Sequence, residues 1–240
     1  MLNKDLIKNN FQKSILTYDE NAIVQEQMAQ FLCSKIQKQK YNKILEIGSY
    51  TGKLTKLAVK KFDFDSYVAL DVVNSFDFIK NLSPKISFIQ SDIEKFETSD
   101  KFDLIISNAT LQWISDFKGV INSLRECLNP QGELVFSTFG NENFREIYHA
   151  IGTTLNYYSL SELREMFPNS TIEPEIHIMA FESPKDVLKH LQLTGVNAIE
   201  NKAWTKKDLL NFENGYTNLC VKRPTLTYNP VYIRILSPVG

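Results

Sequence analysis

The sequence predicts an α/β fold in which helices cover both faces of a doubly wound, mostly parallel sheet of about seven strands. Short apolar segments alternate with helical segments through much of the chain, a pattern typical of parallel strands joined by crossover helices. Two of these segments, 102–107 and 132–138, are rich in apolar residues, as strands covered on both faces should be. At 240 residues the chain suits a single domain, residues 1–240.

The elements of the first half follow from the spacing of apolar residues. An amphipathic helix is expected over about residues 20–38, where apolar side chains recur at near-helical intervals. Five strands are expected after it, at 43–47, 66–71, 85–90, 102–107 and 132–138. The helix before the last strand should end near Leu128, because the turn-forming segment 129–132 interrupts its pattern.

Beyond Thr138 the regular alternation ends. Four helices are expected there, at 141–151, 159–166, 184–194 and 205–213. Two strands, 173–181 and 225–236, are expected to add an antiparallel edge to the sheet. The segment 183–222 would then be a helical cap inserted over the site, and residues 1–38 would form an N-terminal helical lid.

The composition is that of an ordinary globular protein, with 43% apolar and 23% charged residues. A net charge of −1 gives no reason to expect nucleic-acid binding. Cys33, Cys127 and Cys220 are isolated, which fits a reducing cytosol, and no Cys or His spacing predicts a metal site. The N-terminus lacks the apolar core of a signal peptide, and no apolar run approaches membrane-spanning length. We expect a cytoplasmic, monomeric protein that binds neither membranes nor nucleic acids.

The segment 43–55 is the most informative part of the chain. An apolar strand runs into Gly48-Ser49-Tyr50-Thr51-Gly52, and glycines at such a turn let backbone N–H groups approach a ligand. The next strand ends in Asp71-Val72, and a carboxylate there can accept both hydroxyls of a ribose. Together they predict a nucleoside-binding site at the carboxyl ends of parallel strands. An ordinary turn, with Asp71 as a helix N-cap, is the alternative.

The spacing of the glycines narrows the choice of nucleoside. Neither a G-x-G-x-x-G dinucleotide motif nor a P-loop is present, and the bulky Tyr50 leaves poor room for a pyrophosphate. Glu46-x-Gly48-x-Tyr50-x-Gly52 instead resembles the E-x-G-x-G-x-G signature of class I S-adenosylmethionine (SAM) methyltransferases, with Tyr50 in place of the middle glycine. This resemblance implies a Rossmann-like fold with SAM as its cofactor, bound by Glu46, Gly48, Ser49, Tyr50 and Gly52.

Two further strand ends carry candidate cofactor ligands. Asp92 follows the third strand, where its carboxylate can accept from the adenine amino group while the Ile93 N–H reaches a ring nitrogen; a plain turn is the alternative. Asn108 and Ala109 close the fourth strand, where ligands meet the sheet. Methyltransferases of base amino groups carry an Asn/Asp/Ser-Pro-Pro-aromatic motif here. Its absence disfavours an exocyclic amine as substrate, and Gln112-Trp113 can wall the methyl group instead.

Several segments spread over nearly the whole chain occur in the order and spacing of one family. They are Phe11-x-x-Ser14-x-x-x-Tyr18-x-x-x-Ala22-x-x-Gln25, Ser107-Asn108-Ala109-Thr110-Leu111-Gln112-Trp113, Phe136-Ser137-Thr138-Phe139 followed by Glu146-Ile147, Leu191-x-x-Thr194-Gly195-Val196, and Leu226-Thr227-Tyr228. They resemble the malonyl-[acyl-carrier protein] O-methyltransferases of biotin synthesis. The resemblance adds Gln25 to the expected cofactor ligands.

The resemblance implies methyl transfer from SAM to the free carboxylate of malonyl-acyl carrier protein, which starts pimeloyl and biotin synthesis. A carboxylate is already ionised at pH 7 and needs no general base. The enzyme would have to align it with the sulfonium methyl and exclude water. A methyltransferase of a free small dicarboxylic acid and a non-catalytic SAM-binding protein remain the alternatives.

The substrate carboxylate needs a cationic or hydrogen-bonding clamp, because burying it unpaired is costly. Tyr18 is the hydroxyl candidate, since the N-terminal segment can fold over the cofactor. Arg145 and Arg223 are the guanidinium candidates, although each also suits a surface or helix-ending role.

Acyl carrier proteins are acidic, so a local basic rim is expected around the entrance. One candidate group lies on the inserted segment: Lys202, Lys206, Lys207, Lys222 and Arg223. The other is the set of lysines between residues 35 and 61, which also suits a plain solvated face. We favour the inserted segment, because a cap can meet the carrier and admit its arm together.

Overall fold

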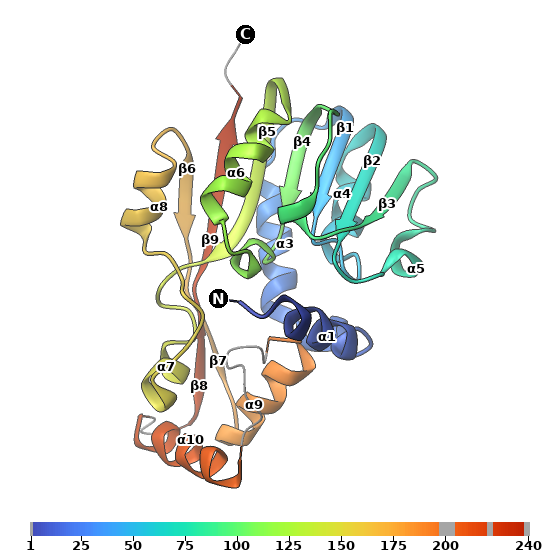
Figure 1. Cartoon of the computed structure of the whole chain (residues 1–240). Coiled ribbons are helices and arrows are strands. Elements are labelled where there is room, and N and C mark those ends of the chain that lie inside the picture. Colours follow the sequence, from blue (N-terminus) through green and yellow to red (C-terminus); the bar gives the residue numbers. More distant parts are fainter. Residues whose placement is uncertain (1, 197–204, 220–222, 238–240) are drawn as a thin grey trace.

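The computed structural model describes residues 2–196, 205–219 and 223–237. Its centre is a seven-stranded sheet with the order β3-β2-β1-β4-β5-β9-β6 (Figure 1). The strands are β1 (Lys40–Ile47), β2 (Asp63–Asp71), β3 (Ile86–Gln90), β4 (Phe102–Ser107), β5 (Leu128–Phe139), β6 (Thr171–Pro174) and β9 (Pro230–Leu236). The first five pair in parallel, and β9 is antiparallel to both its neighbours. The predicted mostly parallel sheet is confirmed.

Helices cover both faces of this sheet, as predicted. On one face, α3 (Ile23–Lys35) and α4 (Lys53–Lys61) pack through Met28, Leu32 and Leu54 into one apolar cluster. On the other, α6 (Phe117–Glu126) packs through Ile121 and Leu124 into a second cluster. The smaller helices are α5 (Phe76–Ile79), α8 (Leu160–Met166) and the 3₁₀ turns η1 (Ile93–Lys95) and η2 (Leu111–Trp113).

Burial on both faces explains the strand sequences. In β1, Ile44 belongs to the first apolar cluster, whereas Leu45 and Ile47 belong to the second. Because β1 lies between β2 and β4, the strand order reverses at β1. The carboxyl ends of these three strands therefore meet at a topological switch point, where open α/β sheets bind their ligands.

The N-terminal segment lies across this edge of the sheet. It contains α1 (Lys4–Ser14), α2 (Tyr18–Asn21) and then α3, where one helix over 20–38 had been predicted (Figure 1). Asn3 caps α1 by accepting a hydrogen bond from the Leu6 N–H at 3.0 Å. The Ala22 N–H bonds to the Tyr18 carbonyl, which ends α2 just before α3 begins.

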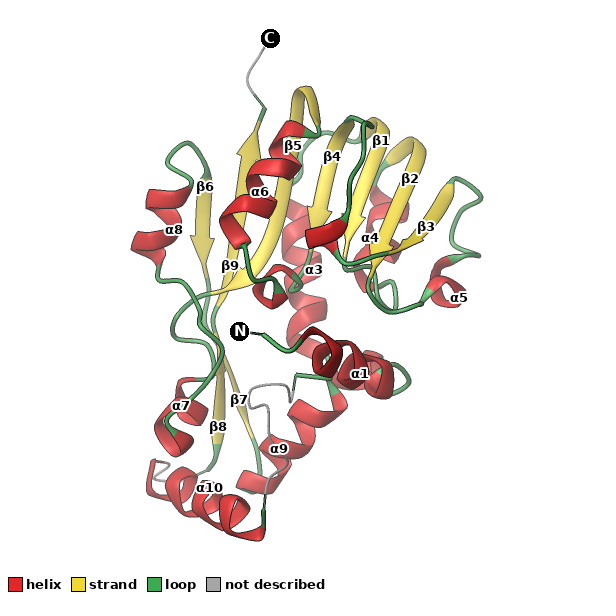
Figure 2. Cartoon of the chain, viewed as in Figure 1, coloured by secondary structure: helices red, strands yellow, loops and turns green. Residues whose placement is uncertain are grey.

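A smaller second layer follows the main sheet in the lower part of Figure 2. Strands β7 (His177–Ala180) and β8 (Thr225–Tyr228) pair antiparallel as a separate sheet. Beside it lie α7 (Arg145–Ile151), α9 (Pro184–Leu193) and α10 (Lys206–Leu219). Residues 197–204 and 220–222 of the predicted cap lie outside the described residues.

Several predicted boundaries were wrong. The strands predicted at 173–181 and 225–236 are each divided between the two sheets, the first into β6 and β7 and the second into β8 and β9. The second division falls at Pro230, which has no N–H to donate to a continuous ladder. The turn-forming segment 129–132 lies within β5, where the pairing with β4 shifts register. The helix predicted at 141–151 begins only at Arg145, after Phe144 adopts a left-handed backbone with φ of 57°. Helix α10 continues to Leu219.

Candidate active site

The glycine turn is tied closely to the end of β2. The Gly48 N–H donates to the Leu70 carbonyl at 2.7 Å, and Gly48 has φ of 77°. A Cβ added to Gly48 would lie 2.0 Å from Thr110 Oγ1, so only glycine fits there. Tyr50 adopts a left-handed backbone as well, with φ of 40°. It therefore keeps the conformation that a glycine at this position would have.

Asp71 is buried beneath this turn. Its two carboxylate oxygens accept from the Tyr50 N–H at 2.9 Å and from the Val73 N–H at 2.7 Å. A carboxylate has about four acceptor positions, so Asp71 keeps capacity for a further donor beside its backbone partners. Burial raises the pKa of Asp71 to about 6, although the backbone hydrogen bonds oppose this shift.

A cavity of about 70 Å³, here the strand-end cavity, opens beside Asp71. Its walls come from α1, from η2 and from the carboxyl ends of β1, β2 and β3: Lys4, Ile7, Ile47, Gly48, Leu70, Asp71, Val72, Ser91, Asp92, Ile93, Thr110, Trp113 and Ile114. The structure thus brings five sequence-predicted residues around one cavity: Gly48, Asp71, Val72, Asp92 and Ile93.

Asp92 lines this cavity and also caps the 3₁₀ turn that follows it. It caps η1 by accepting from the Glu94 N–H at 3.1 Å, which is the turn-forming role that its sequence position allows. The ammonium group of Lys4 on α1 lies 3.6 Å from Asp92 Oδ1 and pairs with Glu94 as well. The lid helix and the far end of the cavity are therefore linked by charge.

A second, smaller pocket lies where α1, α3 and the end of β4 meet. We call it the aromatic pocket, and its volume is about 20 Å³. Its lining residues are mostly aromatic or amide-bearing: Phe11, Tyr18, Gln25, Ala109, Gln112, Trp113, Phe139, Asn143, Phe144, Tyr157, Val196 and Tyr228. Trp113 lines both this pocket and the strand-end cavity, so the two are adjacent.

Hydrogen bonds from Asn108 hold the wall between these spaces. Its Nδ2 donates to the Gln25 carbonyl at 2.9 Å, and its Oδ1 accepts from Ser137 Oγ at 2.7 Å. Ser137 Oγ also accepts from the Ala109 N–H at 3.0 Å. Asn108 thereby joins α3, β4 and β5, while Ala109, with φ of 50°, faces the aromatic pocket.

Two buried acceptors at the aromatic pocket, Gln25 Oε1 and Gln112 Oε1, have no hydrogen-bond partner among the described residues. Asn143 also lines the pocket, and its side chain interacts with the Tyr157 hydroxyl. A buried polar group without a partner lowers the stability of the fold, so the presence of such groups at one pocket indicates a ligand-binding site. Asn143 and Tyr157 were missed by sequence reasoning, because neither stands at a strand end or within a recognisable motif.

The remaining glycine-motif residues support the turn. Glu46 is fully buried and accepts hydrogen bonds from Thr55 Oγ1 and the Tyr67 hydroxyl, each at 2.6 Å. Burial raises the pKa of Glu46 to about 7. Glu46, Ser49, Tyr50 and Gly52 are not among the described residues that line the two cavities.

The three candidates for the carboxylate clamp lie in different places. Tyr18 lines the aromatic pocket. Arg145 lines a neighbouring pocket that shares Asn143 and Tyr157 with it, and its guanidinium group lies 3.3 Å from Glu142 Oε2. Arg223 is exposed, pairs with Glu182 at 3.2 Å, and is not among the described residues that line these pockets. The structure therefore does not bring the three together.

Helix α1 closes the site. The Tyr50 hydroxyl donates to the Phe11 carbonyl at 2.5 Å and lies 3.2 Å from Ser14 Oγ. The Tyr50 ring also makes edge contacts with Phe11 and Tyr18, with centroids 5.6 and 4.7 Å away. Ligand pockets usually measure about 300–1,000 Å³, far more than the two cavities beneath α1. Helix α1 therefore covers two cavities that are smaller than a usual ligand pocket.

Comparison with known proteins defines the class. Residues 24–175 match the family model of a methyltransferase domain. A solved structure from Bacillus halodurans superposes with a TM-score of 0.65 at 12% identity, covering 88% of this chain and 98% of that one. The N-methyltransferase NodS from Bradyrhizobium japonicum, bound to S-adenosyl-L-homocysteine, gives 0.58 at 16% identity, covering 97% and 98%. The matched domain and the fold are those of a SAM-dependent methyltransferase of class I.

Curated relatives define the family within this class. The malonyl-[acyl-carrier protein] O-methyltransferase of Calditerrivibrio nitroreducens is 39% identical over 94% of this chain and 94% of its own length. Its namesake from Chlorobium luteolum is 32% identical over 97% and 95%. The chain belongs to the malonyl-[acyl-carrier protein] O-methyltransferase family.

The chain is therefore an enzyme that uses SAM as its methyl donor, and the site fits this molecule. Asp71 lies beside the strand-end cavity with acceptor capacity for a further donor, and Gln25 Oε1 at the aromatic pocket is a buried acceptor that lacks a partner among the described residues. Within residues 2–196, 205–219 and 223–237 we find no group of three or more His, Cys, Asp and Glu residues suited to a metal ion. In the same ranges no helix is long and apolar enough to cross a membrane.

Proposed function

We propose that this enzyme methylates the free carboxylate of malonyl-acyl carrier protein. The observation that carries the proposal is the near full-length similarity, at 39% identity, to a relative named for that reaction. Enclosure of the aromatic pocket beneath α1 supports it, because methylating a carboxylate requires alignment and exclusion of water.

SAM, when bound, supplies a methyl group made electrophilic by a positively charged sulfur. A carboxylate oxygen of the substrate bonds to this carbon as the carbon–sulfur bond breaks, and no proton is transferred. Two opposite charges vanish in this step, so a pocket with few charges and little water favours it. The aromatic pocket suits this task, since none of its described lining residues carries a charge.

We propose the following SAM contacts. Asp71 accepts the ribose hydroxyls, while Val72, Asp92 and the Ile93 N–H meet the adenine. Gln25 offers its free Oε1 to the amino group of the methionine part, next to the wall formed by Asn108 and Ala109. The Gly48 and Ser49 backbone approaches the same part. Glu46, Tyr50 and Gly52 act by holding the glycine turn in its bound shape.

For the substrate carboxylate, we propose that neutral donors in the aromatic pocket do the positioning. The Tyr18 hydroxyl, Asn143 Nδ2 and the Tyr157 hydroxyl line this pocket. Arg145 and Arg223 are kept as guanidinium candidates, although each would first have to leave its glutamate partner. Arg145 is the nearer of the two, because it lines the neighbouring pocket together with Asn143.

A transfer assay with labelled SAM tests the proposed function. Malonyl-acyl carrier protein should be methylated, with the label lost on mild alkaline hydrolysis, as for an ester. Malonyl-CoA and free malonate are the comparison substrates. Higher turnover with a free dicarboxylic acid than with the carrier would favour the small-acid alternative. SAM binding without transfer to any of them would favour a non-catalytic role.

We also propose that the enzyme acts in the cytoplasm as a monomer, with the carrier protein as its macromolecular partner rather than nucleic acid or membrane. The near-neutral charge of −1 supports this assignment. Gel filtration should give a mass close to 27.7 kDa.

SAM affinity should rise with pH between 5 and 7. Asp71 has a pKa of about 6 in the free protein, so below this pH it carries a proton that it must lose to accept both ribose hydroxyls. The affinity should therefore fall by up to about tenfold per pH unit below 6. Calorimetry at several pH values checks this, with Asp71→Asn expected to flatten the curve. Glu46→Gln removes a nearby group that titrates in the same range. If the pH dependence of SAM affinity is lost in Glu46→Gln but kept in Asp71→Asn, the effect belongs to Glu46.

A lysine at the arginine that clamps the carboxylate should remove most of the turnover and leave SAM affinity unchanged. Lysine keeps the positive charge but loses the two-pronged geometry that fits a carboxylate. Arg145→Lys and Arg223→Lys are the variants, and Arg164→Lys on α8 is a matched surface control. Near-normal kcat in both test variants would contradict both assignments.

Reversing charge at Lys206 and Lys207 should raise KM for the carrier-bound substrate and flatten its salt dependence. Both lysines are exposed at the start of α10, whereas Lys202 and Lys222 lie outside the described residues. In the alternative region, Lys35, Lys43 and Lys53 already pair with carboxylates.

A double variant with glutamate at Lys40 and Lys60 changes net charge by the same amount and is the matched control. Both of these lysines are exposed. Activity on malonyl-CoA should change little in either double variant. An equal loss on both substrates would mean that Lys206 and Lys207 support the fold, and a larger effect in the control would place the carrier at the start of β1 and on α4.

A further inference from the structure

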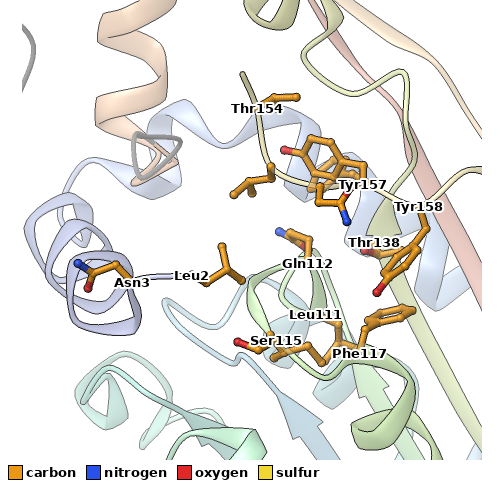
Figure 3. Close-up of a pocket in the computed structure, with 14 residues that line it drawn as sticks. Leu2, Asn3, Leu111, Gln112, Ser115, Phe117, Thr138, Thr154, Tyr157 and Tyr158 are labelled. Atoms are coloured by element: carbon orange, nitrogen blue, oxygen red, sulfur yellow. The ribbon is translucent and has the colours of Figure 1, made fainter. Parts of the chain in front are cut away.

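A cavity of about 400 Å³ has no role in the reaction described so far. It lies between the residues at the start of α1, η2 and the segment 154–158. Figure 3 shows Leu2 and Asn3 at one side, Gln112 and Ser115 at another, and Thr154 and Tyr157 across from them. We call it the large pocket.

The large pocket adjoins the aromatic pocket. Gln112, Phe139 and Tyr157 line both. A chain lying in the large pocket would therefore have its end next to the place proposed for methyl transfer. This adjacency favours a path to the reaction centre over a separate site.

The walls of the large pocket have a distinctive chemistry. None of its described lining residues is charged, and apolar side chains alternate with hydroxyl and amide groups. The pocket that contains Arg145 has a different character, because Glu142 and His149 also line it. An uncharged ligand with both amide and alkyl groups therefore matches the large pocket better than its neighbour.

One buried polar atom in the wall has no hydrogen-bond partner among the described residues. Gln112 Nε2 donates to the Ala109 carbonyl at 2.6 Å, which fixes the amide and leaves Gln112 Oε1 as a free acceptor. The Thr154 hydroxyl is also buried in this wall, where it interacts with the Tyr157 hydroxyl. An acceptor and a hydroxyl of this kind are what an amide in an extended ligand would use.

We propose that the large pocket binds the pantetheine arm of the carrier-linked substrate and delivers the malonyl group to the aromatic pocket. The arm is uncharged between its phosphate and its thioester, and it carries amides, a hydroxyl and a dimethyl group. Its thioester end would lie at Gln112 and Tyr157, and its phosphate end outside. This inference rests on the proposed function, because it assumes a carrier-linked substrate.

The test compares substrates that share the malonyl group but differ in the arm. Malonyl-pantetheine carries the arm without protein or phosphate, and the S-methyl thioester of malonic acid has no arm. Ser115→Trp should fill the large pocket from an exposed position. Asn141→Trp fills the charged neighbouring pocket from an equally exposed position and is the matched control.

In the wild type, malonyl-pantetheine should have a higher kcat/KM than the S-methyl thioester. Ser115→Trp should raise KM for malonyl-pantetheine about tenfold or more, as loss of a bound arm would, with little change for the S-methyl thioester or for the Kd of SAM. Asn141→Trp should leave this difference intact. Thr154→Val, which replaces the hydroxyl by a methyl group, should give a smaller rise that is again confined to malonyl-pantetheine.

Three results would overturn the inference while the proposed function stands. They are equal use of both thioesters by the wild type, equal losses on both in Ser115→Trp, and a larger loss of malonyl-pantetheine activity in Asn141→Trp. Failure of the wild type to methylate any malonyl thioester while binding SAM would instead overturn the proposed function, and the inference with it.

Discussion

Asp71→Ala should weaken SAM binding by about 1.5–3 kcal/mol, which is roughly a ten- to hundredfold rise in Kd. Asp71 is the charged acceptor at the strand-end cavity, and its removal would leave the ribose hydroxyls without their partner. Calorimetric titration of the folded variant with SAM measures the change. Asp77→Ala, which removes an exposed carboxylate paired only with Lys80, is the matched control and should bind SAM normally.

Asp71 also accepts from the Tyr50 and Val73 N–H groups, so its loss could act through the turn alone. A SAM analogue without the ribose 2′-hydroxyl separates the two effects. The wild type should bind this analogue more weakly than SAM, whereas Asp71→Ala should bind both alike. Unchanged SAM affinity in a folded Asp71→Ala protein would contradict the ribose role.

Tyr50→Gly should speed SAM dissociation by on the order of tenfold, since it removes hydrogen bonds and ring contacts that hold α1 closed. Tyr50→Phe, which loses only the hydroxyl, should lie between the glycine variant and the wild type. Stopped-flow displacement of bound SAM measures these rates. Turnover should fall as well, because a lid that closes less often excludes water less well.

Glycine would also relieve the left-handed backbone of Tyr50, so the two effects oppose each other. Tyr148→Phe on exposed α7 is the control for loss of a hydroxyl outside the lid. If both SAM affinity and dissociation rate are unchanged in Tyr50→Gly, the tyrosine merely replaces glycine in a tolerant loop, which the sequence alone also allows.

The parallel core could be predicted because its strands are buried on both faces. That burial makes Ile44–Ile47 and Phe102–Ser107 rich in apolar residues. Such a pattern can be recognised in each segment without knowing which strand pairs with it. The strands begin earlier than predicted where polar residues such as Lys40 and Asp63 pair through their backbones. Backbone hydrogen bonds between strands do not depend on the pattern of apolar and polar side chains, so the sequence does not reveal these first residues.

The same reasoning separates the site residues that were foreseen from those that were not. Asp71 and Asp92 stand directly after strands, so chain position alone places them at one edge of the sheet. Asn143 and Tyr157 come from the irregular connections around α7, and only the folded chain carries them to the aromatic pocket. Arg223 was predicted because it stands just before Leu226-Thr227-Tyr228 in the sequence. In the folded chain it pairs with Glu182 and does not line the pockets described above.

Residues of the N-terminal segment line three of the pockets described above. Leu2 and Asn3 line the large pocket, Lys4 and Ile7 the strand-end cavity, and Phe11 the aromatic pocket. If both ligands bind as proposed, this one segment would contact each of them, and their binding would depend on order. The nucleoside would enter while the segment is displaced, and its return would complete the wall of the pocket proposed for the acyl arm. Steady-state kinetics would accordingly be sequential and ordered, with the methyl donor first on and its demethylated product last off.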